Sequence, residues 1–178
     1  VYRALINELG NEKPIHIESI RIGKLRGNPR SYGNVLLDLG IHDIDLVLDM
    51  VNEDKVRVLS TVLKGNPVTT AWVLLGIGDT VYVLHTSWDY EVRVRRIQVT
   101  LKNKYYDADL LNKVLIRDGT KHVVKGPDQL RQELIHVINV LRGVEKPLID
   151  VVDGIKALAV VNGILTNNPV IDLGRLLT

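Results

Sequence analysis

The residues best suited to chemistry lie in the segment from Gly33 to Asp49, where Asp38, His42 and Asp45 are separated by four and three positions. In a helix this spacing brings all three side chains to one face. Histidine is the only side chain whose unperturbed pKa lies near neutrality, and a neighbouring carboxylate can orient its ring. The pattern therefore fits proton transfer, and a metal site with Asp and His ligands or a simply solvated helix face are the alternatives.

An apolar stripe along the same segment predicts which face of the helix is buried. Its members fall at i, i+4, i+7 and i+11 and are Leu37, Ile41, Ile44 and Leu48. Gly40 costs a helix about 1 kcal/mol relative to Ala, and such local conflict is often found at functional sites. Asp43 lies about 100° around the helix from His42 and off the polar stripe, so we expect Asp43→Asn to leave activity nearly normal.

Periodicity and turn signals divide the rest of the chain into the elements that must position this helix, which we expect to end near Val51. Further helices are predicted at residues 2–9, from Pro127 to Gly143, and at 152–166. Strands are predicted at residues 15–24 (with a bulge), 55–64, 68–77, 80–88, 91–101, 113–117 and 121–125. Because these strands follow one another without intervening helices, we expect an α+β fold: an open, largely antiparallel sheet with helices packed on one face.

The apolar residues of these elements predict what each one buries. In the last two helices the predicted core residues are Leu130, Leu134, Val137 and Leu141, and then Ile155, Leu158, Ala159 and Leu165. Strands 68–77 and 80–88 are apolar on both faces. A sheet buried on both sides in so short a chain indicates a partner, so we expect a homo-oligomer that forms through the sheet face left free by the helices.

Composition and charge exclude several classes of protein. The 178 residues suffice for one good core, and we interpret 1–178 as a single domain. A net charge of +2, from 23 basic and 21 acidic residues, makes no case for nucleic acid or an anionic membrane as a partner. There is no cysteine, which excludes disulfides and thiolate chemistry but says little about compartment. There is also no apolar run near the ~20 residues of a membrane helix and no signal peptide, and we expect a cytoplasmic protein. The chain begins without methionine, which we interpret as a fragment of a longer protein.

Residues 38–45, Asp-Leu-Gly-Ile-His-Asp-Ile-Asp, resemble the D-x-G-x-H-x-x-D signature of the Gfo/Idh/MocA family of NAD(P)-dependent sugar and inositol oxidoreductases. The similarity extends along the chain to residues 7–10, 86–88, 146–149 and 153–158. Members of this family have an N-terminal Rossmann domain followed by an α+β domain, and this chain resembles the second domain alone. The resemblance implies that NAD or NADP is held mainly by the missing N-terminal Rossmann domain and that the isolated chain is inactive.

The resemblance also implies roles for individual residues. Asp38 and His42 match the catalytic carboxylate and imidazole: His42 would exchange the proton of the substrate hydroxyl while hydride moves to or from the nicotinamide, and Asp38 would help to position the sugar. Asp45 matches a position often near the substrate. The implied function is that of the substrate-binding and oligomerisation domain of an oxidoreductase acting on a sugar, polyol or nucleotide sugar. A non-catalytic domain for dimerisation or ligand sensing is the alternative.

Two E-K-P sequences imitate the family motif that carries a catalytic lysine within the Rossmann domain. The first, at residues 12–14, precedes the first strand, and the second, at 145–147, follows a helix, so we interpret both as ordinary turns. Gly76-Ile77-Gly78 lacks the third glycine of a dinucleotide fingerprint, because that position is Val81, and it lies in a predicted hairpin. We therefore assign no cofactor-binding residue and no metal ligand to this chain.

Aromatic and basic residues near these elements are further candidates for the substrate site. They are Tyr32 and Arg30 in the loop before the Asp/His helix, and Trp88 and Tyr90 at the end of a strand. Loops in such places commonly contact ligand, although a plain surface loop and core packing of Trp88 are alternatives. A predicted strand also carries Arg93, Arg95 and Arg96, which could meet a nucleotide-sugar phosphate or nucleic acid, or could form a solvated strand face.

Overall fold

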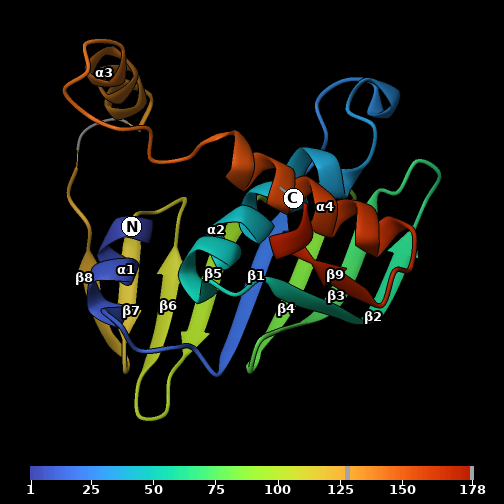
Figure 1. Ribbon diagram of the computed structural model, residues 1–178, viewed down its shortest axis with the longest axis horizontal. Coiled ribbons are helices and arrows are strands. Elements are labelled where there is room, and N and C mark those ends of the chain that lie inside the picture. Colours follow the sequence, from blue (N-terminus) through green and yellow to red (C-terminus); the bar gives the residue numbers. More distant parts are fainter. Residues whose placement is uncertain (127–128, 177–178) are drawn as a thin grey trace.

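The structure is a computed structural model that describes residues 1–126 and 129–176, with the side chains of Arg30 and Gln129 left out. Its described residues form an open nine-stranded sheet (Figure 1). The strands are β1 (His16–Ile22), β2 (Lys55–Lys64), β3 (Thr70–Ile77), β4 (Thr80–Ser87), β5 (Val94–Thr100), β6 (Tyr105–Asp109), β7 (Val114–Arg117), β8 (Thr120–Val123) and β9 (Val170–Asp172). Their order is β8-β7-β6-β5-β1-β4-β3-β2-β9. Only the β1–β4 pair is parallel within the described sheet, which confirms the predicted α+β fold.

Helices cover one face of this sheet. They are α1 (Tyr2–Leu9), α2 (Ile41–Val51), α3 (Gln129–Leu141) and α4 (Val151–Leu165), with short turns η1 (Pro29–Ser31), η2 (Leu36–Gly40) and η3 (Leu173–Arg175). Figure 1 shows α1, α2 and α4 in front of the strands, whereas α3 stands away from this layer. Across the described part of the chain, no helix has the length and apolarity needed to cross a bilayer.

The core lies between the sheet and the helix layer, because alternate residues of each central strand face the helices. Its largest fully buried side chains are Tyr82, Tyr106, Leu5, Ile17, Leu36, Ile44, Leu75, Ile77, Leu84, Ile97, Ile164 and Leu173. Helix α2 packs against α4 and β1, and η2 packs against β4. The segment that carries Asp38 and His42 is therefore held between the centre of the sheet and a second helix.

The bulge predicted in residues 15–24 is wrong. Strand β1 pairs residue for residue with β4 and β5, without a shift of register. Two polar residues of β1 face the helices and interrupt the apolar alternation from which the bulge is predicted. Ser19 shares a hydrogen bond of 2.7 Å with Tyr82, and Arg21 has a carboxylate partner on α2. The two phases of isoleucine are thus the two faces of one regular strand, and the register shift that does occur lies in β2, between Val58 and Ser60.

The predicted apolar stripe is buried at Ile44 and packs partly against the core at Ile41 and Leu48, but it fails at Leu37, which precedes α2. The buried residues of the Asp/His helix are Leu36, Gly40, Asp43, Ile44, Val47 and Val51, whereas Leu37 is 38% exposed. The cause is η2, which is one turn of π-helix: the N–H of Ile41 donates to the carbonyl of Leu36, five residues earlier. The extra residue in this turn rotates everything before it relative to α2.

The predicted core faces of the last two helices are also corrected. In α3, the four leucine and valine residues at 130, 134, 137 and 141 are exposed, and the predicted start at Pro127 lies outside the described residues. In α4, Ala159 and Leu165 pack against the core as predicted, whereas Ile155 and Leu158 are exposed and Ala157 and Val160 are buried in their place. Helix α4 is apolar almost all round, so its periodicity selects no face. Gly163 packs closely against β9, where a Cβ would clash with Cδ1 of Ile171, so a larger residue would require this side chain to move.

Candidate active site

The turn that presents Asp38 is built by residues that a helix start requires. The Asn34 side chain accepts hydrogen bonds from the N–H groups of Leu36 and Leu37, at 3.0 and 3.1 Å, and so satisfies two free donors of the first turn. Gly40 then faces β4, where a Cβ would lie 3.4 Å from Thr86 Cγ2 and 3.5 Å from Leu84 Cδ2. The lack of a side chain at Gly40 brings η2, and with it Asp38, close to the end of β4.

Asp38 is fixed by Trp88, which follows β4. The indole N–H of Trp88 donates to Asp38 Oδ2 at 2.9 Å, and the indole is only 6% exposed. Tyr32 packs edge-on against the same indole, with ring centroids 6.5 Å apart. The other carboxylate oxygen of Asp38 has no hydrogen-bond partner within the described chain, so it remains available to a ligand. The candidates Asp38, Trp88 and Tyr32 therefore form one cluster.

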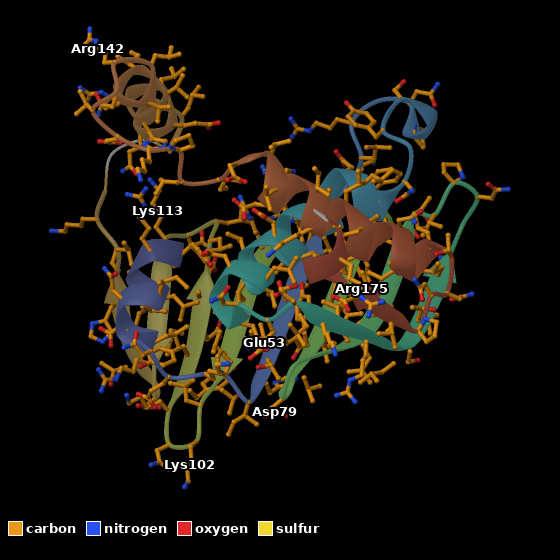
Figure 2. The ribbon with its side chains drawn as sticks, in the orientation of Figure 1. Glu53, Asp79, Lys102, Lys113, Arg142 and Arg175 are labelled. Atoms are coloured by element: carbon orange, nitrogen blue, oxygen red, sulfur yellow. The ribbon has the colours of Figure 1, made fainter. Side chains whose placement is uncertain are left out.

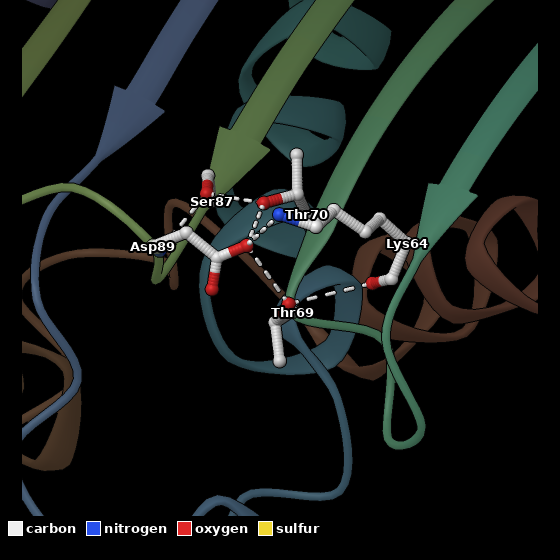
Figure 3. Close-up of polar contacts among 5 residues, drawn as sticks. All are labelled: Lys64, Thr69, Thr70, Ser87 and Asp89. Atoms are coloured by element: carbon white, nitrogen blue, oxygen red, sulfur yellow. Dashed lines mark hydrogen bonds and ion pairs between the residues drawn. The ribbon is translucent and has the colours of Figure 1, made fainter.

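A polar network holds the segment on which Trp88 lies (Figure 3). Asp89 Oδ2 accepts hydrogen bonds from Thr70 Oγ1 at 2.8 Å and Thr69 Oγ1 at 3.0 Å, and the Asp89 N–H donates to Ser87 Oγ. The Trp88 N–H donates to the Thr69 carbonyl at 2.8 Å. The hydrogen bond from Thr70, ahead of those from its other partners, lowers the pKa of Asp89. This network fixes the indole that in turn orients Asp38.

His42 lies one turn after Asp38 at the solvent-exposed surface of α2, and its ring forms no hydrogen bond to any described residue. Partial burial, followed by the positive charge of Arg21, lowers the pKa of His42. The carboxylate of Asp43 opposes this shift, Arg95 adds to it, and Asp38 opposes it more weakly. The imidazole is therefore neutral at neutral pH and has a free nitrogen, as a proton acceptor requires.

Asp43 is buried and ion-paired, so the expectation that Asp43→Asn leaves activity nearly normal stays a prediction, and this variant is not a neutral control for His42. The Asp43 side chain is only 2% exposed and forms a two-point ion pair with Arg21 of β1, with Nε–Oδ2 at 2.8 Å and Nη2–Oδ1 at 2.6 Å. The π turn places Asp43 on the buried side of α2, directly above the sheet. Sequence reasoning missed this pair, although one signal was available: Arg21 occupies the strand phase of Ile17, where an unpaired charge would be costly.

The three strand arginines have different environments. Arg96 lies 3.0 Å from a carboxylate oxygen of Asp107, and Arg93 is exposed. Arg95 is opposite Arg21 in the β1–β5 register, and its buried Nε has no hydrogen-bond partner among the described residues. Burial, and then the charge of Arg21, lowers the pKa of Arg95. Arg21 alone forms the ion pair with Asp43, and the Asp43 carboxylate acts on the Arg95 guanidinium only at longer range, where it opposes the lowering of its pKa.

The structure does not bring all the predicted site residues together. Asp45 lines a separate groove of about 900 Å³ with Asp49 and Asp153, and burial together with these two carboxylates raises its pKa. Tyr90 packs against His85, on the face of the sheet away from the helices. Arg30 lies in η1, and its side chain is outside the described set.

A metal ion and a dinucleotide cofactor each require a particular arrangement of residues to be bound. No group of three or more His, Asp or Glu side chains in the described ranges could hold a metal ion. Gly76 and Ile77 end β3, and Gly78 forms the hairpin turn to β4 with φ of +56°. This turn leads into a strand, whereas a pyrophosphate-binding glycine turn leads into a helix. The described residues therefore do not fit a dinucleotide cofactor at this turn.

Several solved structures share this fold. The 3-dehydrogenase GnnA from Acidithiobacillus ferrooxidans has a TM-score of 0.79 at 22% identity, over 93% of this chain and 57% of that one. The dehydrogenase MviM from Clostridium difficile has a TM-score of 0.73 at 21% identity, over 93% and 58%. A variant of KijD10, a 3-ketoreductase from Actinomadura kijaniata solved with TDP-benzene and NADP, has a TM-score of 0.76 at 13% identity, over 93% and 56%. These proteins are oxidoreductases of the Gfo/Idh/MocA type.

A curated relative carries the same resemblance at the level of sequence. The UDP-N-acetylglucosamine 3-dehydrogenase of Acidithiobacillus ferrooxidans is 30% identical to this chain over 115 residues, which make up 62% of this chain and 36% of that protein. No family model matches the chain. The resemblance to Gfo/Idh/MocA-type oxidoreductases that residues 38–45 predicted is thus confirmed, and the chain spans about a third of the curated relative's length.

Proposed function

We propose that this chain is the C-terminal, substrate-binding domain of an NAD(P)-dependent oxidoreductase that acts on a hydroxyl of a sugar or nucleotide sugar. The observation that carries the proposal is an exposed imidazole, His42, without a partner in the described chain and with a lowered pKa, beside the carboxylate of Asp38 that Trp88 holds. The names of a relative and a structural neighbour, a UDP-N-acetylglucosamine 3-dehydrogenase and a 3-ketoreductase, support this class of substrate.

In the proposed reaction, His42 handles the proton. When the alcohol is oxidised, the neutral ring accepts the hydroxyl proton; when a ketone is reduced, the imidazolium returns it. Arg21 and Arg95 disfavour the charged ring and so keep it ready to accept in one direction and to donate in the other. The free oxygen of Asp38 accepts a hydrogen bond from a second sugar hydroxyl, which orients the substrate.

The cofactor belongs to another part of the protein in this proposal. The glycine turn at residues 76–78 lacks the geometry of a dinucleotide site, and the three solved neighbours are longer than this chain, which covers 56–58% of each. A Rossmann domain outside the 178 residues would hold NAD or NADP, which exchanges hydride with the substrate carbon. The described residues then act on the substrate side alone.

The test uses the enzyme that contains both domains. His42→Ala should lower kcat about 10²–10⁴-fold, the usual contribution of a positioned acid or base, while the KM for NAD(P) stays unchanged. Asp38→Asn should also lower turnover, because the amide keeps the shape but loses the charge. In the wild type, alcohol oxidation should decline only below the usual histidine pKa of about 6.5, because the pKa of His42 is lowered.

His122→Ala is the matched control, since this imidazole is exposed on the edge strand β8. It should leave kcat and the pH profile unchanged. Equal activity of His42→Ala and His122→Ala would refute proton transfer and would support a non-catalytic domain for dimerisation or ligand sensing.

A further inference from the structure

A second pocket, of about 490 Å³, lies beside α1 at the end of the sheet nearest α3. Four of its lining side chains are cationic: Arg3, Arg95, Lys113 and Lys125. No aspartate or glutamate is among its described lining residues. Figure 2 places Lys113 next to α1, whereas Lys102 projects from the hairpin between β5 and β6, at the opposite end of the strands. A cavity of this size, lined by charges of one sign, is suited to an anionic ligand.

The cations of this pocket form no ion pair with a described carboxylate, although Arg3 also lines the neighbouring acidic groove of Asp45, Asp49 and Asp153. None of the four lies within 4.0 Å of a carboxylate in the part of the chain that the structure describes. The carboxylate of Glu145 is held by hydrogen bonds from His136 and Asn139, which lower its pKa, and Arg3 contributes to this only as a smaller effect. Arg95 contributes a buried Nε without a partner among the described residues. A buried donor left unpaired is costly, and an arginine satisfies it best with the paired oxygens of a phosphate or carboxylate.

The pocket adjoins the candidate catalytic residue. Leu46, which lines it, follows His42 by four positions on α2, so the two side chains lie on one face of the helix. Arg95 also lines the pocket, and its charge acts on His42. A ligand with its phosphate groups in the pocket could therefore extend along α2 to place a hydroxyl at His42 and Asp38.

We propose that this pocket binds the diphosphate group of the ligand, with Arg95 at its base and Arg3, Lys113 and Lys125 around it. The identity of the attached sugar rests on the proposed function, whereas the affinity for diphosphate does not. Two ligands of such an enzyme carry this group, the nucleotide sugar and the dinucleotide. The direction from the pocket toward His42 favours the nucleotide sugar, because it is the substrate hydroxyl that must reach the imidazole.

The experiment is calorimetric titration of the 178-residue chain with inorganic pyrophosphate, UDP, UDP-N-acetylglucosamine and NADPH. Pyrophosphate and both uridine nucleotides should bind, and Arg95→Gln and Lys125→Gln should each weaken binding at least about tenfold, as the loss of a charge-assisted hydrogen bond does. Lys102→Gln, which removes a lysine at the opposite end of the strands, should leave affinity unchanged. Lys125 is exposed, so its variant keeps the test decisive even where Arg95→Gln does not fold.

The outcomes separate this proposal from the proposed function. Diphosphate binding that Arg95→Gln weakens supports the pocket, even where His42→Ala leaves turnover unchanged and the proposed function fails. Equal affinity of the wild type and the Arg95, Lys125 and Lys102 variants overturns the pocket, even where His42→Ala abolishes turnover. Binding of NADPH that excludes UDP, and is weakened by the same two variants, would overturn the assignment to the nucleotide sugar.

Discussion

Neighbouring residues in the signature have opposite environments. His42 is exposed and makes no hydrogen bond to the described chain, while Asp43 is buried and forms two hydrogen bonds to Arg21. The spacing of Asp38, His42 and Asp45 indicated proton transfer, and the resemblance implied roles for both Asp38 and His42. Neither the spacing nor the resemblance could predict the partner of Asp38. Trp88 is 50 residues further along the chain, and the strand order decides where its indole lies.

At this scale, Asp43→Asn should destabilise the chain strongly. The amide keeps the volume but leaves the Arg21 guanidinium, whose side chain is 11% exposed, without a counter-charge. Breaking one side of a buried ion pair costs about 3–5 kcal/mol. Urea unfolding at pH 7 should therefore show a much lower midpoint for this variant.

The control for this prediction is Asp79→Asn, since Asp79 is exposed in the β3–β4 turn (Figure 2). Its midpoint should equal that of the wild type. A midpoint for Asp43→Asn within error of both would show that the ion pair contributes little.

Among the secondary-structure elements, strong periodicity predicted which helices and strands are present better than it predicted which face each of them buries. The helices near residues 2–9 and 152–166 and the four long strands after Asp54 are present, because each has enough apolar residues to define its type. Strands β6 and β9 were not predicted, since β6 carries two aspartates in five residues and β9 has only three residues. The π turn at residues 36–40 depends on one hydrogen bond and on packing against β4, neither of which a helical repeat reveals.

Helix α4 packs against α2 and η2, which carry His42 and Asp38. The contribution of α4 to stability can be tested at its N-terminus. Asp150 accepts hydrogen bonds from the N–H groups of Val152 and Asp153, and the Asp153 side chain accepts one from the Asp150 N–H, which forms a capping box. Asp150→Ala should lower the free energy of unfolding by about 1 kcal/mol, measured by urea denaturation. Asp150→Asn should retain most of the wild-type free energy of unfolding, because asparagine is an equally good N-cap. If alanine and asparagine have the same effect, the capping box does not stabilise α4.

For the molecule as a whole, the uncovered face of the sheet is the largest feature that the fold leaves unexplained. Across β2, β3, β4 and β1, one row of paired residues carries Val62, Trp72, His85 and Ile20. Trp72 stacks on His85 with ring centroids 3.6 Å apart, yet 43% of Trp72 remains exposed. His85 is itself buried, and its Nε2 has no partner in the described chain. An apolar face of this kind indicates a binding surface, as the sequence predicted.

We therefore expect the chain to form homo-oligomers through this face, and Trp72→Lys to prevent it. A lysine there would place a charge in the centre of the contact, where an unpaired charge is costly to bury. Light scattering at tens of micromolar should report an oligomer for the wild type and a monomer for the variant.

Val123→Lys is the control, because Val123 is also apolar and exposed but lies on β8, at the far end of the sheet. It should remain oligomeric. A monomeric wild type would contradict the proposal directly. An oligomer that persists in Trp72→Lys would show that the interface is on another surface, and the exposed apolar side of α3 would then be the next candidate.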